Sequence, residues 1–297
     1  MNLGELSRPI TIYWDLSPAD RLCPDYLRFC EQITSVGPLQ LHLFDDSCKN
    51  CLPILERMQG TPLAITLTTG AATLTPANLE RLHRLGLRGL LMYAHSYGEL
   101  EETRSILAAA GAHFAAGIAF EATCDNWREL PQVVRFSLEQ GVASLTLPMQ
   151  RLYHGAVPFM LTDAERDELG QQLAGIDCSG LRLTIHDPFL WRAFHPDTPF
   201  PGGGCQAANT MLAIAPDGTV YPCPSLPLAL GSLTETTLKE LVGGEAKKRF
   251  RAAVAILPDA CLDCPEKAGC KGGCRGRSLV AGNDVALPDP ACGIANN

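Results

Sequence analysis

The sequence predicts an α/β fold in which a partial (β/α) barrel is followed by a small cysteine-rich domain. Strand-like and helix-like segments alternate over the first two thirds of the 297 residues. The stretch 195–204 is rich in proline and glycine, which is typical of a linker, and seven of the thirteen cysteines follow it. A chain of this length accommodates one large domain and a smaller one.

The barrel prediction rests on short apolar or alternating runs, whose starts recur about every 25 residues through the sixth run. They lie at 10–16, 39–44, 62–68, 87–93, 115–120, 143–148 and 181–185. Repeated strand–helix units imply parallel strands joined by right-handed crossovers. Six or seven units fit a partial TIM-like barrel better than a complete one of eight. An open doubly wound sheet is the alternative that periodicity leaves open.

Local signals mark where helices begin and end between these runs. Thr75-Pro76 predicts a helix start, because proline is favoured at the first helical position. Thr162 and Glu165 have the spacing of a capping box. Glycines stand where three helices should end, at Gly111, Gly141 and Gly175.

Composition narrows the function classes. The formal net charge is −8 and the pI about 5.4, with no Lys/Arg run longer than three residues, so we expect neither a nucleic-acid partner nor an anionic membrane. No apolar run is long enough to span a bilayer, and the N-terminus lacks a signal segment. We therefore expect a cytoplasmic protein. In a reducing compartment, grouped cysteines are metal ligands more often than disulfides.

The first two cysteines of the C-terminal part flank a predicted β-hairpin. Twelve residues separate Cys205 from Gly218, and four separate Gly218 from Cys223. Asp217-Gly218 is a turn signal, because glycine adopts positive φ without strain. The hairpin over 211–223 should therefore bring Cys205 and Cys223 together.

The other five cysteines follow a second spacing, Cys261-x2-Cys264-x5-Cys270-x3-Cys274, with Cys292 further on. A Cys-x2-Cys pair can bind one metal centre from a tight loop. Structural zinc sites usually combine two separated Cys-x2-Cys or His pairs, and the stretch from Cys261 to Cys292 has only one such pair. We favour iron–sulfur clusters over zinc, and zinc over disulfides.

The combined spacing, C-x12-G-x4-C, a gap, C-x2-C-x5-C-x3-C, a gap and C, resembles the SPASM motif at every position. SPASM domains are C-terminal extensions of radical-SAM enzymes that modify peptides and proteins. The resemblance implies two [4Fe–4S] clusters, the first held by Cys205, Cys223 and Cys274, the second by Cys261, Cys264, Cys270 and Cys292. The first set then lacks a fourth cysteine, which leaves an open iron, a water or a ligand such as Asp197.

The N-terminal part resembles a radical-SAM barrel whose S-adenosylmethionine motifs are missing. Residues 10–17 look like the first strand, which in that family runs into C-x3-C-x2-C. Alignment on Ser17 places Asp20, Pro24 and Leu27 at the three cysteine positions. After the second strand, residues 44–47 read Phe-Asp-Asp-Ser where relatives carry Gly-Gly-Glu.

Together these features imply a pseudo-enzyme: residues 1–195 form a radical-SAM-like partial barrel, and residues 205–297 form a SPASM iron–sulfur domain. The description resembles the SPASM partner protein of GeoRSP-type peptide-modification systems. We expect an electron-transfer or peptide-docking partner of a radical-SAM enzyme, with a peptide or protein substrate. We do not expect S-adenosylmethionine as a cofactor, or independent catalytic activity.

Two alternatives remain at this level. Four further cysteines near the loops after the first two strands could form a non-standard third cluster and make the chain an active radical-SAM/SPASM enzyme: Cys23, Cys30, Cys48 and Cys51. Alternatively, the chain is a binding module whose clusters are structural staples. The isolated Cys124 and Cys178 are interpreted as packing residues. Five histidines lie in or near predicted strands, where some would point into the barrel mouth: His42, His95, His113, His154 and His186.

Overall fold

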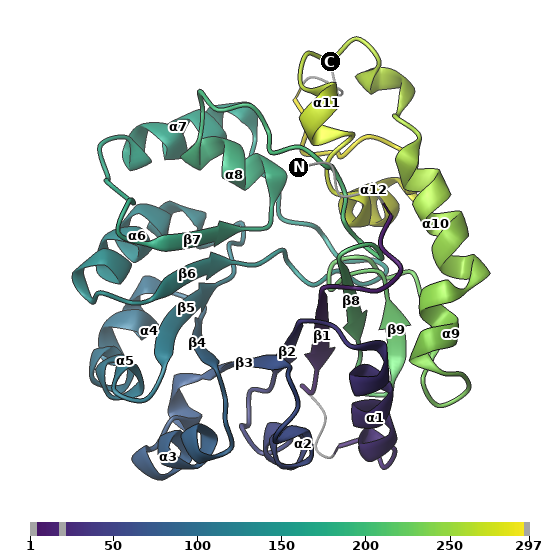
Figure 1. The fold of residues 1–297 in the computed structure, drawn as a ribbon. Helices are drawn as coiled ribbons and strands as arrows, with labels where there is room; N and C mark the ends of the chain where they lie inside the picture. Colours follow the sequence, from purple (N-terminus) through teal and green to yellow (C-terminus); the bar gives the residue numbers. More distant parts are fainter. Residues whose placement is uncertain (1–4, 18–21, 294–297) are drawn as a thin grey trace.

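A computed structural model of the chain describes residues 5–17 and 22–293. In these ranges ten strands form one curved sheet in the order β10-β9-β8-β1-β2-β3-β4-β5-β6-β7 (Figure 1). The strands are β1 Thr11–Asp15, β2 Gln40–Phe44, β3 Ala64–Gly70, β4 Gly89–Ala94, β5 Ala115–Phe120, β6 Ser144–Leu147, β7 Arg182–Ile185, β8 Met211–Ile214, β9 Thr219–Tyr221 and β10 Gly231–Ser232.

The seven predicted barrel strands are all present as β1 to β7, and each neighbouring pair is parallel. β7 and β10 stand at the two ends of the strand order, so the described sheet is an open, partial barrel. β1 to β7 lie side by side in chain order, without the reversal of strand order that a doubly wound sheet has. The prediction of a partial barrel is therefore confirmed, and the doubly wound alternative is wrong.

The predicted hairpin is also present, but its position is new information. β8 and β9 are antiparallel, and Gly218 in the turn between them has φ +87°. β8 also pairs with β1 in parallel, with Met211 opposite Thr11. The hairpin therefore extends the barrel sheet by two strands, and Cys205 and Cys223 lie beside the start of the barrel.

Helices cover the outer side of the barrel strands and also form part of the C-terminal region (Figure 1). They are α1 Tyr26–Val36, α2 Cys51–Met58, α3 Pro76–Arg84, α4 Tyr97–Glu102, α5 Arg104–Gly111, α6 Leu130–Glu139, α7 Asp163–Leu173, α8 Pro188–Phe194, α9 Leu238–Gly243, α10 Glu245–Ala255, α11 Lys267–Cys270 and α12 Arg275–Gly282. Thr75 caps α3, and Thr162 and Glu165 form the predicted capping box of α7. None of the described helices has the length and apolar character needed to cross a bilayer.

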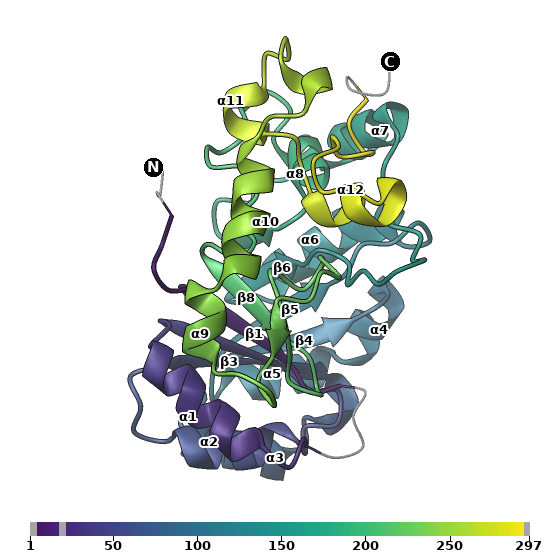
Figure 2. The same ribbon diagram turned by 90° about the vertical axis from the view of Figure 1, so that its right-hand side faces the viewer.

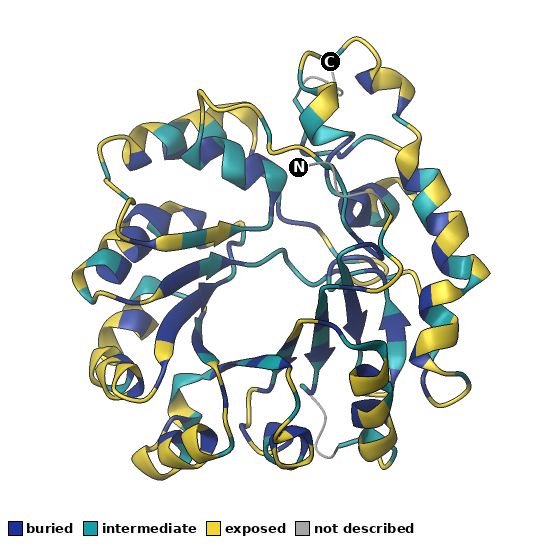
Figure 3. Cartoon of the chain, viewed as in Figure 1, coloured by how far each residue is buried: buried dark blue, intermediate teal, exposed yellow. Residues whose placement is uncertain are grey.

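The main core lies between the strands and these helices (Figure 3). In β1, Ile12 and Trp14 are buried, and Trp14 packs against Phe29 of α1 at a ring-centroid distance of 6.0 Å. Side chains alternate along a strand, so Tyr13 and Asp15 point to the opposite face, into the barrel. This alternation sends polar side chains inward.

The C-terminal elements wrap around the hairpin and return to the barrel (Figure 2). α9 lies next to α1, where Gln32 accepts a hydrogen bond from the Leu238 amide at 2.7 Å. The Arg28 side chain donates to the Leu233 carbonyl at 2.9 Å. α12 reaches the barrel just after β7, where Arg277 donates to Asp187, and the remaining cysteines lie on the segments around α11 and α12.

Candidate metal centre

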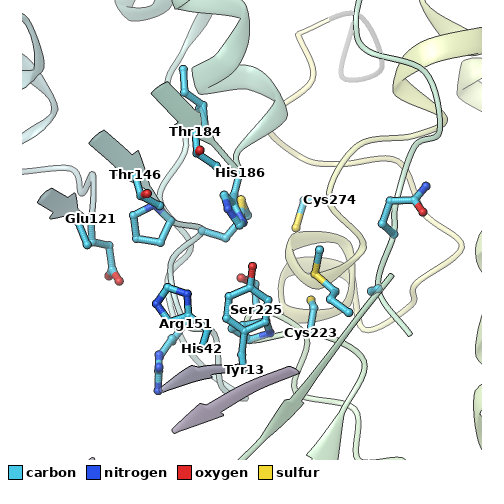
Figure 4. Close-up of a pocket in the computed structure, with 18 of the residues that line it drawn as sticks. Tyr13, His42, Glu121, Thr146, Arg151, Thr184, His186, Cys223, Ser225 and Cys274 are labelled. Carbon is cyan, nitrogen blue, oxygen red and sulfur yellow. The ribbon is translucent and has the colours of Figure 1, made fainter. Parts of the chain in front are cut away.

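The structure brings together the three cysteines of the first predicted set. Cys205 precedes the hairpin, Cys223 follows β9, and Cys274 is the residue before α12. All three line one cavity, and Cys223 and Cys274 are seen in Figure 4. Burial raises the pKa of each thiol, to about 12 for Cys274, and the neighbouring thiols raise the pKa values of Cys223 and Cys274 further. The set is therefore a compact, desolvated group of sulfur atoms.

Backbone amides point at these sulfurs. The Ala207 amide donates to Cys205, those of Ser225 and Leu226 donate to Cys223, and that of Arg277 donates to Cys274. Each of these bonds opposes the effect of burial and lowers the pKa of its thiol. Hydrogen bonds to sulfur also tune iron–sulfur clusters. The environment thus fits thiolates that bind a metal cluster.

The second predicted set gathers on the loops around α11. Burial raises the pKa of Cys261, and Cys292 and Cys264 raise it further. Burial raises the pKa of Cys270 to about 11, and Cys292 adds to this effect. No three His, Cys, Asp or Glu side chains within 5–17 and 22–293 converge on a point that suits a single metal ion. Cysteines around a cluster bind different iron atoms, so they do not need one common point.

Two buried arginines on α12, Arg275 and Arg277, lie close to the two cysteine sets. Arg277 is 1% exposed and donates to both Asp187 and Asp289. Asp289 accepts the Cys274 amide at 2.7 Å, and its carbonyl accepts the Cys292 amide at 3.0 Å. Asp187 caps α8, so this ion triad joins the barrel to both cysteine sets. Arg275 and Arg277 were not among the residues predicted from the sequence. The available signal was one arginine directly after a predicted ligand and a second two residues further on.

The cavity beside the first set has a volume of about 910 Å³ and fills the interior of the barrel (Figure 4). Tyr13 stacks on His42 with a centroid distance of 5.4 Å, and His186 meets the Tyr13 ring edge-on at 6.5 Å. His42 Nε2 lies 2.7 Å from Thr68 Oγ1. Of the five predicted histidines, His42 and His186 line this cavity. His95, His113 and His154 do not.

Charged side chains line the cavity at the carboxyl ends of the strands. Arg151 pairs with Asp15, and its guanidinium lies 4.3 Å above the Phe44 ring. The Tyr93 hydroxyl donates to Glu121 at 3.4 Å, and burial raises the pKa of Glu121. The cavity wall therefore contains Arg151, whose charge Asp15 neutralises, and the separate carboxyl group of Glu121.

The neutral state of His42 leads to a prediction about acid stability. Burial, with a smaller effect of His186, lowers its pKa from 6.5 to about 4. Unfolding lets His42 take up a proton below pH 6.5, so stability falls as the pH drops from 6.5 towards 4. Between pH 7 and pH 5, the free energy of unfolding measured with urea should fall by about 2 kcal/mol more in the wild type than in His42→Gln. His113→Gln, at an exposed site, serves as the control. Equal losses in wild type and His42→Gln would contradict this prediction.

The loop after β2 contains residues 44–47, which the resemblance aligns with a Gly-Gly-Glu segment. Asp45 is fully buried and accepts hydrogen bonds from the amides of Ser47 and Cys51, at 3.1 and 2.8 Å. The Asp46 amide donates to Ser17 at 2.8 Å, which ties this loop to the end of β1. Asp20 lies outside the described residues, while Pro24 and Leu27 are at the start of the α1 region.

Among the described residues, the structure gives a close sulfur–sulfur approach for two of the four cysteines of the alternative third cluster. The sulfurs of Cys48 and Cys51 are 3.9 Å apart. Cys30 is buried in α1, where the charges that act on it are Arg57 and Glu31. Cys23 is partly exposed, as is Cys178, and Cys124 is exposed. Packing therefore does not account for Cys124.

Asp197, the suggested extra ligand of the first set, is exposed after α8. It is not among the residues that line the cavity with Cys205, Cys223 and Cys274.

Residues 205–265 match the family model of SPASM, an iron–sulfur cluster-binding domain. The chain carries a SPASM domain. The matched span contains Cys205, Cys223, Cys261 and Cys264, and the remaining three cysteines follow it. The SPASM domain binds iron–sulfur clusters, and this SPASM domain includes the hairpin that pairs with β1.

Curated relatives match almost the whole chain. The PqqA peptide cyclase of Ruegeria pomeroyi is 25% identical over 294 residues, which cover 90% of this chain and 77% of that protein. The PqqA peptide cyclase of Granulibacter bethesdensis is 21% identical and covers 91% of this chain and 78% of its own length. The similarity to these relatives thus includes both the barrel and the SPASM domain.

Solved structures show the same fold. Streptococcus suis SuiB superimposes with a TM-score of 0.70 at 15% identity, covering 97% of this chain and 78% of that protein. The protein anSMEcpe with bound AdoMet gives a TM-score of 0.68 at 14% identity, with 97% and 91% coverage. The predicted radical-SAM-like partial barrel followed by a SPASM domain is confirmed.

Proposed function

We propose that this chain is an iron–sulfur accessory protein that carries two [4Fe–4S] clusters and acts beside a radical-SAM enzyme that modifies a peptide. The observation that carries the proposal is a contrast between the two parts of the chain. Seven cysteines gather in two sets in the C-terminal part, whereas the described residues that align with the missing motif are Pro24 and Leu27. We assign residues 1–195 to the barrel and 205–297 to the SPASM domain.

The cysteine environment supports the cluster assignment. The first cluster would be held by Cys205, Cys223 and Cys274, and the second by Cys261, Cys264, Cys270 and Cys292. Bound clusters supply one-electron transfer. This chain's own contribution is to desolvate the thiolates, to direct backbone amides at their sulfurs and to place positive charge beside them.

The loop after β2 supports the loss of S-adenosylmethionine binding. The Asp45 carboxylate is committed to hydrogen bonds that close this loop, and the loop contains no glycine. Arg151 and Asp15 neutralise each other at the neighbouring strand ends. None of these groups is free to hold the amino group of a bound cofactor.

A peptide substrate is supported by the relatives and by the cavity. Two relatives are PqqA peptide cyclases, and SuiB has been solved bound to its precursor peptide SuiA. The cavity of about 910 Å³ is large enough for several side chains of a peptide, and it is lined by cysteines of the first set. The chain would present the peptide to its partner, exchange electrons with that partner, or do both.

The test begins with iron and sulfide counting after anaerobic reconstitution, followed by an assay with S-adenosylmethionine and dithionite. We expect about eight irons per chain, since each cluster holds four, and no 5′-deoxyadenosine above the protein-free control. About twelve irons with robust 5′-deoxyadenosine would instead establish an active enzyme with a third cluster on Cys23, Cys30, Cys48 and Cys51. Two clusters that stay redox-silent at all accessible potentials would favour a binding module with clusters as staples.

A further inference from the structure

Arg275, the first residue of α12, is a buried guanidinium with one donor left over. Its side chain is among the largest fully buried ones, at 1% exposure. Nη1 donates to the carbonyls of Val285 and Leu287 at 3.2 and 3.0 Å, and Nη2 donates to that of Lys271 at 2.8 Å. Nε is buried and has no acceptor in the part of the chain that the structure describes. A buried donor without an acceptor is costly, so this one calls for a partner.

The guanidinium lies between the two cysteine sets. Arg275 directly follows Cys274, and its guanidinium packs against the turn at Gly272, where an added Cβ would come within 2.9 Å of Nη2. Its charge acts on Cys205 of the first set and on Cys261 and Cys270 of the second. One side chain is therefore electrostatically linked to both sets.

Arg275 differs from its neighbour in having no hydrogen bond to a carboxylate among the described residues, although the charge of Asp289 also acts on it. Arg277 donates to two carboxylates, Asp187 and Asp289. All the hydrogen bonds that the structure gives to Arg275 go to backbone carbonyls, which carry no net charge. A buried cation needs compensating negative charge nearby. Cysteine thiolates and a bound cluster would supply it.

We propose that Arg275 is a positioning residue shared by both clusters: its charge balances the thiolates of the two sets, and its Nε donates a hydrogen bond to a sulfur of the bound clusters. The proposal rests on the two clusters of the proposed function. Because a nearby cation and a hydrogen bond to sulfur both favour the reduced cluster, Arg275 should raise both reduction potentials.

Arg251 provides a matched control. It donates to the carbonyls of Cys205 and Ala207 at 2.8 and 3.0 Å, and it pairs with Glu5. Its charge acts on Cys205, in the first set. Loss of Arg251 should therefore affect one cluster, whereas loss of Arg275 should affect two.

The experiment is a redox titration followed by electron paramagnetic resonance on the reconstituted full chain, with iron counting on each sample. Arg275→Gln should keep about eight irons and lower both midpoint potentials. Arg275→Lys, which keeps the charge and loses Nε, should lower both by less. Arg251→Gln should lower only the potential of the first cluster.

If Arg275→Gln does not bind its clusters, the two midpoint potentials of Arg275→Lys test the proposal instead, because the lysine variant retains the charge. Full iron content with both potentials unchanged in Arg275→Lys, or a shift of only one cluster in either Arg275 variant, would overturn the proposal. A wild-type chain with fewer than two clusters would instead contradict the proposed function, so the two failures are distinguishable.

Discussion

Replacing Cys261, Cys264 and Cys270 by serine is expected to remove about four of about eight irons and to leave the first cluster in place. Serine is a poor ligand for iron–sulfur clusters, which are held by cysteine thiolates. The first set is positioned independently by the hairpin and by the residue before α12, so it keeps its three cysteines. Iron and sulfide counting together with electron paramagnetic resonance would measure the loss.

The reciprocal variant, Cys223→Ser with Cys274→Ser, should remove the other half of the iron. Burial raises the pKa of both thiols, and Cys274 raises the pKa of Cys223 further. Cys124→Ser is the control, because Cys124 is exposed and far from both sets in the sequence. Complete loss of iron from either variant would show that the seven cysteines serve one cooperative unit rather than two separable sets. Retention of about eight irons would remove the mutated residues from the ligand list.

Local signals explain why much of the fold could be predicted from the sequence. Short apolar runs in the sequence predict the seven barrel strands. The capping box at Thr162 depends on two residues three apart, and the turn at Gly218 depends on a dipeptide. The cysteine spacing is equally local within each loop. Each of these signals depends only on residues close together in the sequence, so it predicts the local structure without knowledge of the rest of the fold.

Long-range pairing explains what the sequence left open. β8 pairs with β1 although the paired residues are 200 positions apart in the sequence. Neither strand has a sequence pattern that predicts which strand it will pair with. Asp15 and Arg151 form an ion pair across the barrel mouth in the same way. Arg275 and Arg277 were missed for a different reason, since arginines on a short helix normally face solvent. Here the neighbouring carbonyls and carboxylates offset the cost of burying them.

Removing the iron is expected to loosen the C-terminal elements in a graded order. Residues 259–271 contain only a short helical turn and the four-residue α11, and most of their side chains are at least partly exposed. With so little apolar core, this segment depends on its metal for structure. In hydrogen–deuterium exchange of iron-free against reconstituted protein, its amides should exchange at least about 100-fold faster, equal to about 2.7 kcal/mol of lost protection.

The hairpin provides the internal control for this measurement. β8 and β9 have backbone hydrogen bonds to each other, β8 also pairs with β1, and these bonds do not involve the cysteines. Their amides should change little on loss of iron. α12 should fall between the two extremes, because Arg277 still ties it to Asp187 in the barrel when the metal is absent. Equal acceleration in all three segments would mean that the clusters hold the edge of the barrel sheet as well as the loops, and that the hairpin depends on metal despite its pairing with β1.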